Sequence, residues 1–366
     1  MKILFINVLC ATRSTGRICA NLAKEYELLG HEVKIAYGRS ENIPQEFQKY
    51  AVRVGTDWDV RLHAIKTRLA DKHGLGSKKA TEKFLKWAEE YSPDLLWLHN
   101  IHGYYLNYEM LFAWIKRHSE MEVKWTLHDC WAFTGHCCYF DMVKCDKWET
   151  KCEQCPQKSS YPATNLLSNC EDNFKRKKKA FQGVKNMTLI TPSRWLAALV
   201  KKSFLREYPV EVIYNKIDTT VFKPTDGDFR DRIGLGSKRI ILGVASTWDK
   251  RKGLDDFLAL AKMIDENSVI VLVGLSEKQL KNLPENVIGI RRTNGQKELA
   301  EIYTAADVFV NPTYEDNYPT VNLEARACGT PVITYKTGGS PESAGENAIV
   351  VETGNVADLA RQIALI

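Results

Sequence analysis

The regular alternation of short apolar segments with longer segments of helical periodicity is the feature that most constrains the fold of this chain. The apolar segments, rich in Val, Ile and Leu, occupy residues 2–8, 31–37, 94–99 and 123–127, and again 240–245, 269–274, 286–293 and 307–312. Parallel strands that are buried on both faces have this near-continuous apolar composition, and helices connect them. Because the pattern starts a second time after residue 239, it predicts an α/β fold with two doubly wound, Rossmann-like domains.

Length, composition and charge limit the class of protein. A chain of 366 residues exceeds the usual size of one domain, and its 44% hydrophobic and 26% charged residues are typical of a soluble globular protein. The net charge of +6 is too small to indicate a nucleic acid as a partner. No apolar run approaches the roughly 20 residues that span a bilayer. Asn7 interrupts the first run, which predicts a buried strand rather than a signal peptide, and hence a cytoplasmic protein.

Polar loops follow several of the predicted strands in the first half of the chain. Gly16 lies after the first strand and just ahead of a helix predicted over residues 18–29, where free N–H groups can bind an anion. His99 and His102 lie at the end of the third strand, and His128 follows the fourth. Because open α/β sheets bind ligands at the carboxyl ends of their strands, these histidines are candidate substrate contacts. A metal held by the first two, or a simple pairing of the third with the aspartate that follows it, are the alternatives.

Residues 313–340 combine an acidic turn with a helix start. The turn, Tyr314-Glu-Asp-Asn-Tyr-Pro319, precedes a helix predicted over residues 320–328, which ends at Gly329. N–H groups at a helix start can bind phosphate, and carboxylates accept hydrogen bonds from sugar hydroxyls. This stretch is therefore suited to a ligand that carries both phosphate groups and hydroxyls.

The same stretch resembles the nucleotide-sugar motif of glycosyltransferase family 4, a large family of retaining enzymes with the GT-B fold. Asp316 and Glu324 flank seven residues where the family usually has two glutamates, and Glu324 opens the run Glu-Ala-x-Ala-x-Gly-x-Pro-Val-Ile. The resemblance implies two domains that face each other across a cleft, residues 1–209 on the acceptor side and residues 210–366 on the nucleotide-sugar side. Family members usually continue further, so the native chain is expected to be longer.

The resemblance also implies roles for single residues. Lys252, in a Lys-Gly pair after a strand, matches the lysine that contacts the donor diphosphate, and Glu324 matches the acid that accepts the ribose hydroxyls. Asp316 would hold the transferred sugar, together with His128. The implied catalytic residues are His128, Lys252 and Asp316, and the implied donor-binding residues are Gly16, Arg17, Arg251, Lys252, Glu315, Asp316, Asn317, Tyr318, Pro319, Thr320 and Glu324.

The donor site differs in part from the family pattern. Ser246 and Thr247 stand where a partner arginine is usual, and Arg251 is the expected replacement. Glu315 directly precedes Asp316, so either acid can hold the sugar. The resemblance implies that these cations do the work of a catalytic metal, and no catalytic cofactor is expected.

The implied reaction is transfer of a sugar from a nucleoside diphosphate sugar, a UDP- or GDP-sugar, with retained anomeric configuration. The acceptor would be a glycan or a lipid-linked molecule in the synthesis of cell-surface polysaccharide. Two alternatives remain open: a sugar-nucleotide epimerase with the same fold, and a zinc-containing protein that binds nucleic acid.

The resemblance does not explain a cysteine-rich insertion at residues 130–156. Its last two cysteines, Cys152 and Cys155, have the spacing of a zinc knuckle. Cys145 and one of Cys137 or Cys138 would complete four thiolates around a structural zinc. Free thiols and a disulfide are the alternatives.

Residues 175–179 form a dense basic run, and the amphipathic segment 193–206 places Trp195 near further basic side chains. Basic charge beside exposed aromatic side chains is typical of peripheral proteins on anionic bilayers. We therefore predict contact with an anionic membrane, at the inner face of the cell membrane. A solvated charged face beside a buried apolar face is the alternative.

Overall fold

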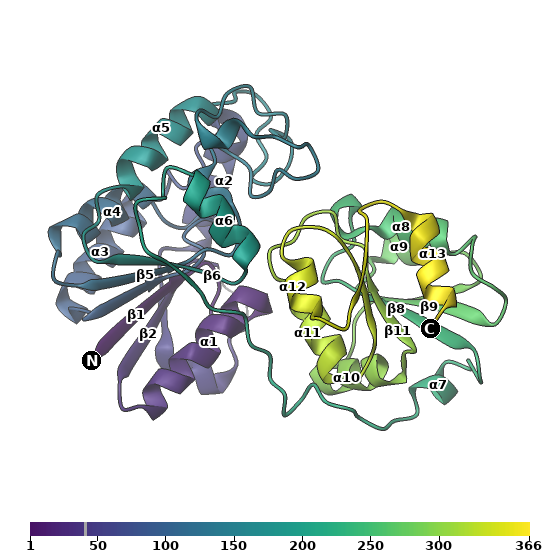
Figure 1. The fold of residues 1–366 in the computed structure, drawn as a ribbon. Helices are drawn as coiled ribbons and strands as arrows, with labels where there is room; N and C mark the ends of the chain where they lie inside the picture. The colour runs from purple at the N-terminus through teal and green to yellow at the C-terminus, as the bar shows by residue number, and fades with distance from the viewer. Residues whose placement is uncertain (40–41) are drawn as a thin grey trace. The chain divides into compact units, whose positions relative to one another are not determined.

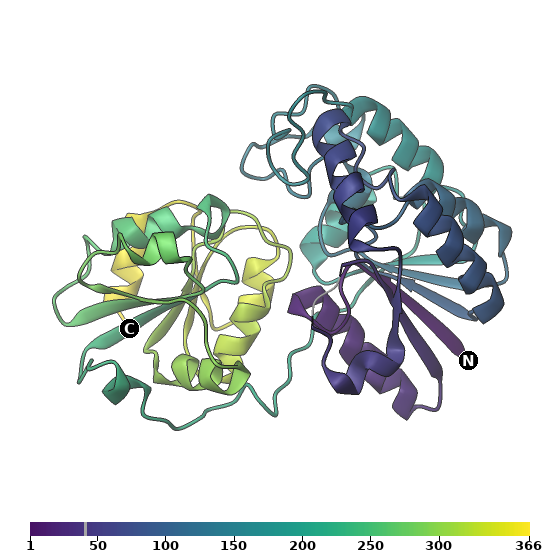
Figure 2. The same cartoon turned by 180° about the vertical axis from the view of Figure 1, so that it is seen from behind.

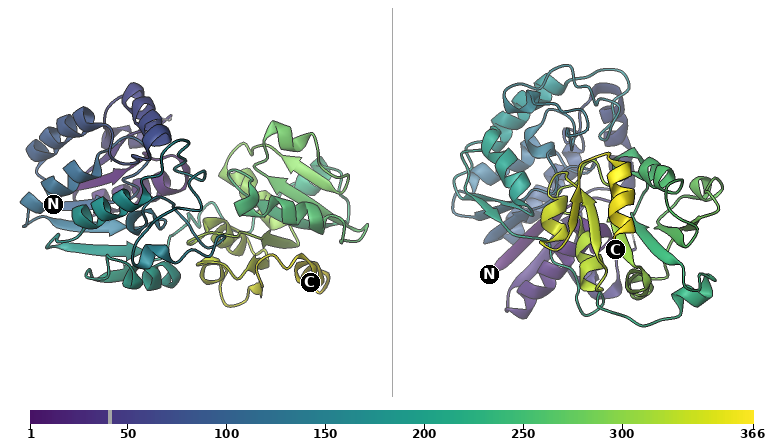
Figure 3. Two further views of the ribbon diagram at one scale, coloured as in Figure 1. Left: turned by 90° about the horizontal axis from the view of Figure 1, so that it is seen from above. Right: turned by 45° about the vertical axis from the view of Figure 1, so that its right-hand side comes forward.

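The computed structural model describes residues 1–39 and 42–366, which form two compact units. The first unit comprises residues 1–214 and the second residues 215–366 (Figure 1). Each unit contains a parallel β-sheet with helices on both of its faces, which the further views in Figures 2 and 3 also show. The predicted doubly wound α/β architecture is confirmed for each unit.

Within the described residues, the sheet of the first unit has seven strands in the order β3-β2-β1-β4-β5-β6-β7. Its elements are β1 (Lys2–Asn7), α1 (Arg13–Leu28), β2 (Glu32–Tyr37), η1 (Gln45–Tyr50), β3 (Ala51–Arg53), α2 (Asp57–Ala70), α3 (Lys78–Tyr91), β4 (Leu95–Leu98), α4 (Tyr108–Arg117), β5 (Glu122–Thr126), η2 (Trp131–Phe133), η3 (Lys147–Glu149), α5 (Cys170–Phe181), β6 (Met187–Thr191), α6 (Arg194–Lys202) and β7 (Val210–Val212). The elements named η are 3₁₀ helices.

The sheet of the second unit has six strands among the described residues, in the order β10-β9-β8-β11-β12-β13. Its elements are α7 (Phe229–Arg232), β8 (Arg239–Val244), η4 (Lys250–Lys252), α8 (Leu254–Leu260), β9 (Ser268–Val273), α9 (Glu277–Leu280), β10 (Val287–Ile290), α10 (Gln296–Ala305), β11 (Val308–Asn311), α11 (Thr320–Ala327), β12 (Val332–Tyr335), α12 (Ser340–Ala344), β13 (Ile349–Val351) and α13 (Val356–Ala364).

Successive residues of one strand supply the cores on opposite faces of the sheet. In β8, Ile240 and Leu242 pack in the core that contains residues of α10 and α11, whereas Ile241 packs in the core that contains residues of α8 and α13. Side chains alternate across a strand, so a strand with a helix on each side needs apolar residues at every position. This requirement explains the continuous apolar runs in the sequence.

The structure differs from the sequence-based expectation at two element boundaries. Helix α1 begins at Arg13, five residues before the predicted start at residue 18. The first unit ends at residue 214 rather than at 209, because β7 pairs in parallel with β6 and so belongs to the first sheet.

Candidate active site

The order of the strands reverses direction once in each sheet, and the loops at these points bring the candidate residues together. In the first unit the reversal lies between β1 and β4, and in the second unit between β8 and β11. Ligands of doubly wound folds bind beside the carboxyl ends of the strands at such a point. The loop after β8 carries Lys252, and the loop after β11 carries Asp316.

Lys252 and Asp316 contact each other directly. The Lys252 Nζ atom donates a hydrogen bond to the carboxylate of Asp316, and both side chains stay partly accessible, at 20% and 14% exposure. The next residue, Gly253, has a φ angle of +74°, and a Cβ atom there would lie 2.2 Å from the carbonyl oxygen of Pro312. Only glycine allows the two loops to approach this closely, so the Lys-Gly pair is required by packing as well as by charge.

Arg251 stabilises the acidic loop. Its guanidinium donates to the carbonyl oxygen of Glu315 at 2.8 Å, and its own carbonyl accepts from the N–H of Tyr314 at 2.8 Å. Arg251 therefore positions the loop that carries Asp316.

The residues of the acidic loop and of α11 divide into buried and accessible ones. Glu315 and Asn317 are 4% and 2% exposed, and Tyr318 and Pro319 are buried as well. Asp316, Thr320 and Glu324 remain partly accessible. Of the two candidate acids, Asp316 is thus the one whose side chain a ligand can reach more easily.

Glu324 lies on α11, one turn after the start of that helix. Its Oε2 atom accepts a hydrogen bond from the hydroxyl of Tyr303 on α10, at 3.0 Å. Burial, reinforced by the charge of Glu324, raises the pKa of Tyr303 well above its usual value, so this hydroxyl stays a donor. Pro319, the N-cap residue of α11, makes no side-chain cap hydrogen bond. The N–H of Asn322 donates to the carbonyl oxygen of Pro319, and the N–H groups at the very start of the helix are a candidate anion site.

Buried polar residues that sequence reasoning missed hold this region in place. Asn322 on α11 donates to Ser343 at 2.8 Å and accepts from Asn311 at 2.8 Å, which ties α11 to β11 and α12. The carboxylate of Asp256 on α8 accepts from two tyrosine hydroxyls, those of Tyr314 at 2.9 Å and Tyr335 at 2.6 Å. In the sequence, Asn322 and Asp256 are recognisable only as polar residues at positions where the helix period predicts burial.

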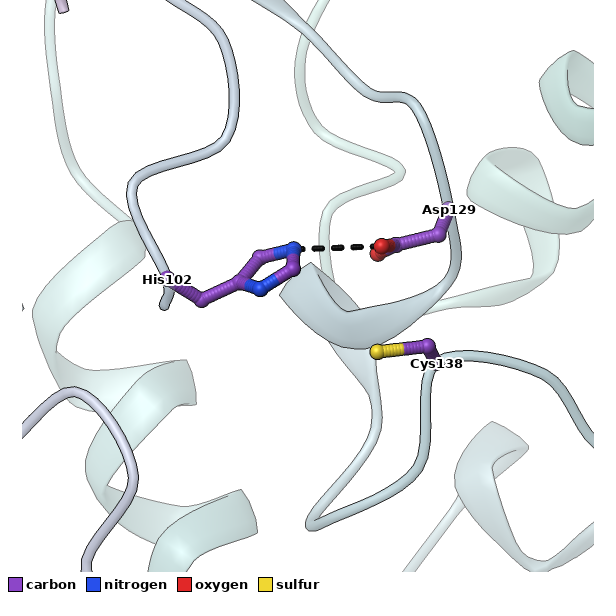
Figure 4. A group of neighbouring side chains, drawn as sticks. All are labelled: His102, Asp129 and Cys138. Atoms are coloured by element: carbon purple, nitrogen blue, oxygen red, sulfur yellow. Dashed lines mark hydrogen bonds and ion pairs between the residues drawn. The ribbon is translucent and has the colours of Figure 1, made fainter. Parts of the chain in front are cut away.

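In the first unit, the histidines at the strand ends form two pairs in one pocket. His99 Nδ1 lies 2.9 Å from His128 Nε2, and His102 Nε2 lies 3.1 Å from the carboxylate of Asp129. Figure 4 shows the second pair, with the sulfur of Cys138 pointing toward it. The pocket is lined by the end of β5 and by residues that follow β4 and β5, including these histidines. The structure therefore brings together the histidines that the sequence placed at separate strand ends.

His128 is neutral at physiological pH. Burial lowers its pKa to about 4, with the nearby Asp129 carboxylate opposing the shift and His102 adding to it. A neutral imidazole can donate one hydrogen bond and accept another, which suits contact with a sugar hydroxyl rather than with a phosphate.

Gly16 and Arg17 lie in the first turns of α1, beside the end of β1. A Cβ atom on Gly16 would lie 3.2 Å from that of Leu9, so the helix packs closely on the preceding loop. Arg17 is exposed.

The basic run is exposed only in part, at Lys175, Lys178 and Lys179. Lys177 is 1% exposed, and its ammonium donates to the carbonyl oxygens of Trp131 at 2.6 Å and Thr134 at 3.0 Å. Arg176 makes two hydrogen bonds to the carboxylate of Glu109, and Lys175 pairs with Glu171. Because α5 has one face toward the core, the middle of the run is buried.

Two family models match this chain. The model described as Glycosyltransferase Family 4 matches residues 15–221, and the model described as Glycosyl transferases group 1 matches residues 238–366. The two parallel-sheet units have the GT-B fold. The chain belongs to glycosyltransferase family 4.

Known proteins that resemble the chain carry related descriptions. It is 33% identical to a D-inositol 3-phosphate glycosyltransferase of Streptomyces bingchenggensis, over 42% of this chain and 39% of the relative. It is 24% identical to the putative colanic acid biosynthesis glycosyl transferase WcaC of Escherichia coli, over 68% of this chain and 62% of that protein. The solved structure of Anabaena Alr3699/HepE in complex with UDP aligns with a TM-score of 0.67 at 15% identity, over 100% of this chain and 89% of that one. The chain thus spans less than half the length of the first of these relatives.

No helix among the described residues is long and apolar enough to cross a membrane.

Proposed function

We propose that this protein transfers a sugar from a nucleoside diphosphate sugar to an acceptor hydroxyl, with retained anomeric configuration. The observation that carries the proposal is the contact of Lys252 with Asp316 at the reversal point of the second sheet, next to the uncapped start of α11. A cation and a helix N-terminus side by side attract a diphosphate.

We propose a separate role for each of Lys252, Asp316 and Glu324 in the second unit. A diphosphate carries more negative charge than one carboxylate. It would therefore replace Asp316 as the partner of the Lys252 ammonium. This exchange frees the carboxylate of Asp316 to accept hydrogen bonds from the sugar. Glu324, held by Tyr303, would accept the hydroxyls of the ribose. Lys252 and the N–H groups of α11 then stabilise the charge that develops on the departing diphosphate.

His128 is the proposed contact of the transferred sugar from the first unit. Its neutral imidazole, positioned by the buried His99, would contact a hydroxyl without attracting the diphosphate. We assign no protein nucleophile, and the leaving phosphate is the proposed base for the acceptor hydroxyl.

A UDP-sugar is the donor to test first, because Alr3699/HepE is solved with UDP and with UDP-glucose. We expect one sugar nucleotide from a panel of UDP- and GDP-sugars to raise the melting temperature of the protein. NMR of the product should then show the same anomeric configuration as the donor. Interconversion of the donor sugar without transfer would instead support the epimerase alternative, and an inverted product would contradict retention.

The role of WcaC, described as a glycosyl transferase of colanic acid biosynthesis, supports an acceptor in cell-surface polysaccharide synthesis. Such acceptors are commonly lipid-linked, which calls for a membrane-binding face. We place that face on α2. Trp58, Leu62, Ile65 and Leu69 are 69%, 57%, 52% and 48% exposed, and their spacing puts them on one side of the helix.

The charge around this stripe favours an anionic bilayer as its occupant. Arg61, Lys66 and Arg68 are exposed on the same helix. The acidic residues of its first turn are already engaged, Asp57 with Arg53 and Asp59 in the helix cap. Each basic residue near an anionic surface contributes about 1 kcal/mol, and the apolar side chains insert into the interface. Figure 2 shows α2 on the outside of the first unit.

Replacing Leu62 and Ile65 by glutamate is expected to weaken binding to vesicles of phosphatidylcholine and phosphatidylglycerol by at least about tenfold, because each substitution removes apolar burial and adds repulsion. Co-sedimentation measures the effect. The matched control is glutamate at Leu28 and Leu29, which are even more exposed, at the end of α1, and should leave binding unchanged. Unaltered vesicle binding by the α2 variant would contradict the proposal, and loss of self-association would assign the stripe to a second copy of the chain.

A further inference from the structure

Five cysteines and one histidine of the first unit line a single pocket. The pocket lies in the cysteine-rich insertion and contains Cys137, Cys145, Cys152 and Cys155, together with His136 and Cys170. Cys138, the alternative to Cys137 in the sequence, does not line it and points instead toward His102 and Asp129 (Figure 4). The tertiary structure therefore selects Cys137.

Backbone N–H groups point at two of these sulfurs. The N–H of Gly135 donates to Cys152 Sγ at 3.1 Å, and the N–H of Gln157 donates to Cys155, which is also hydrogen-bonded to Cys137. Hydrogen bonds of this kind stabilise thiolates, and they commonly surround metal-bound sulfur. Gln154, between the last two cysteines, has a φ angle of +46°, which turns the chain sharply at this point.

His136 supplies the second, independent observation. Its side chain is fully buried, and its Nδ1 atom lies 2.6 Å from the carboxylate of Asp71. Its Nε2 atom has no hydrogen-bond partner among the described residues. His136 also lines the cysteine pocket. A histidine that bonds a carboxylate through one nitrogen and has the other buried without a partner beside several cysteines has the arrangement of a zinc ligand with its supporting carboxylate.

We propose that this pocket binds one zinc ion through the thiolates of Cys137, Cys152 and Cys155 and the Nε2 atom of His136. A set of three thiolates and one imidazole is a common structural zinc site. Three thiolates leave one excess negative charge on a divalent ion. The side chain of Lys177 is buried nearby, where it donates hydrogen bonds to the carbonyl oxygens of Trp131 and Thr134. In its charged form it would offset that excess charge.

Binding requires the ligands to draw together. In tetrahedral zinc sites the Zn–S distance is about 2.3 Å, which brings the sulfurs to about 3.8 Å of one another. Among the described residues, the group whose ligand atoms all lie within 4.8 Å is instead His102, Asp129 and Cys138. In that group the carboxylate already accepts from His102 and from the N–H of Trp131, so hydrogen bonding accounts for it. Cys137, Cys152 and Cys155 lie in loop segments between short elements, and the proposal requires their side chains to move together when the ion binds.

The ion would cross-link a segment with little core of its own. Trp148 stacks on Phe140 at 4.8 Å between ring centroids and lies 5.2 Å from Phe133, and the residues around this cluster are mainly polar. Zinc bound to residues on both sides of the cluster would hold the insertion against η2, which follows His128 and Asp129. Its role is structural, beside the histidine pocket rather than in the reaction.

Elemental analysis of the full chain, purified under reducing conditions without chelator, should find about one zinc per chain, as expected for a site of this kind. The variants Cys155→Ser and His136→Ala should lose most of this zinc, whereas Cys138→Ser and Cys145→Ser should retain it. Cobalt titration of the wild-type protein gives a readout that does not depend on variants, through thiolate charge-transfer bands of three sulfurs. Wild-type protein without zinc and without cobalt binding would overturn the proposal. Loss of zinc in Cys145→Ser with retention in His136→Ala would overturn the assignment of His136.

Discussion

Replacement of Lys252 by alanine is expected to lower kcat/KM for sugar transfer by about tenfold to more than a hundredfold. A charge-assisted hydrogen bond to a phosphate contributes on the order of 1.5–3 kcal/mol. Lys252 also neutralises Asp316, so its removal leaves a carboxylate that repels the incoming diphosphate. The loss in kcat/KM should therefore lie near the upper end of this range. Steady-state kinetics measure it, and circular dichroism checks that the variant is folded.

Lys250 provides a matched control for this variant. It lies in the same 3₁₀ helix, η4, but is exposed. Substitution of an exposed residue usually changes a free energy by less than about 0.5 kcal/mol, so Lys250→Ala should remain within about twofold of the wild type. A folded Lys252→Ala protein with normal turnover would refute the role of this lysine in donor binding.

Replacement of Glu324 by glutamine is expected to weaken donor binding and to lower kcat/KM by about tenfold or more, because a neutral amide accepts hydrogen bonds less strongly than a carboxylate. The substitution preserves the shape of the side chain. The hydroxyl of Tyr303 can still donate to the amide oxygen, so α10 and α11 should remain packed. Calorimetric titration with the nucleoside diphosphate alone measures the loss of affinity apart from chemistry.

Glu346, an exposed glutamate of the same unit, is the control for Glu324. Glu346→Gln should bind the nucleotide as the wild type does. If Glu324→Gln bound the nucleotide and turned over normally, Glu324 would not be a donor ligand, and its bond to Tyr303 would be its whole function.

The sequence alone determined the features that depend on neighbouring residues. The apolar runs predicted the strands, since a strand between two helical layers must be apolar at each position. The acidic turn, the proline and the glycine predicted α11 within one residue of its observed end, because caps and breakers act locally. The contiguous motif from Asp316 to Ile333 identified the family for the same reason.

Contacts between distant segments were decided only by the tertiary structure. The basic run on α5 predicted an exposed patch, but Lys177 is buried because its position faces the core. There its ammonium donates hydrogen bonds to the carbonyl oxygens of Trp131 in η2 and of Thr134 just after η2. Conversely, the apolar stripe of α2 is exposed, because the opposite face of that helix, with His63 and Thr67, packs on the domain. The period of a helix defines its faces but does not say which of them meets the core.

Which of two adjacent residues faces a given pocket is likewise decided by the tertiary structure. Cys137 and Cys138 are indistinguishable by spacing, yet Cys137 lines the cysteine pocket whereas Cys138 lies beside His102 and Asp129. Lys252 and Asp316 are 64 residues apart, and only the strand order, with β8 beside β11, brings their loops together. Local sequence therefore determined which elements form and which family they belong to. Packing of the sheets determined which side chains contact each other, since contacts between distant segments depend on the fold of the whole chain.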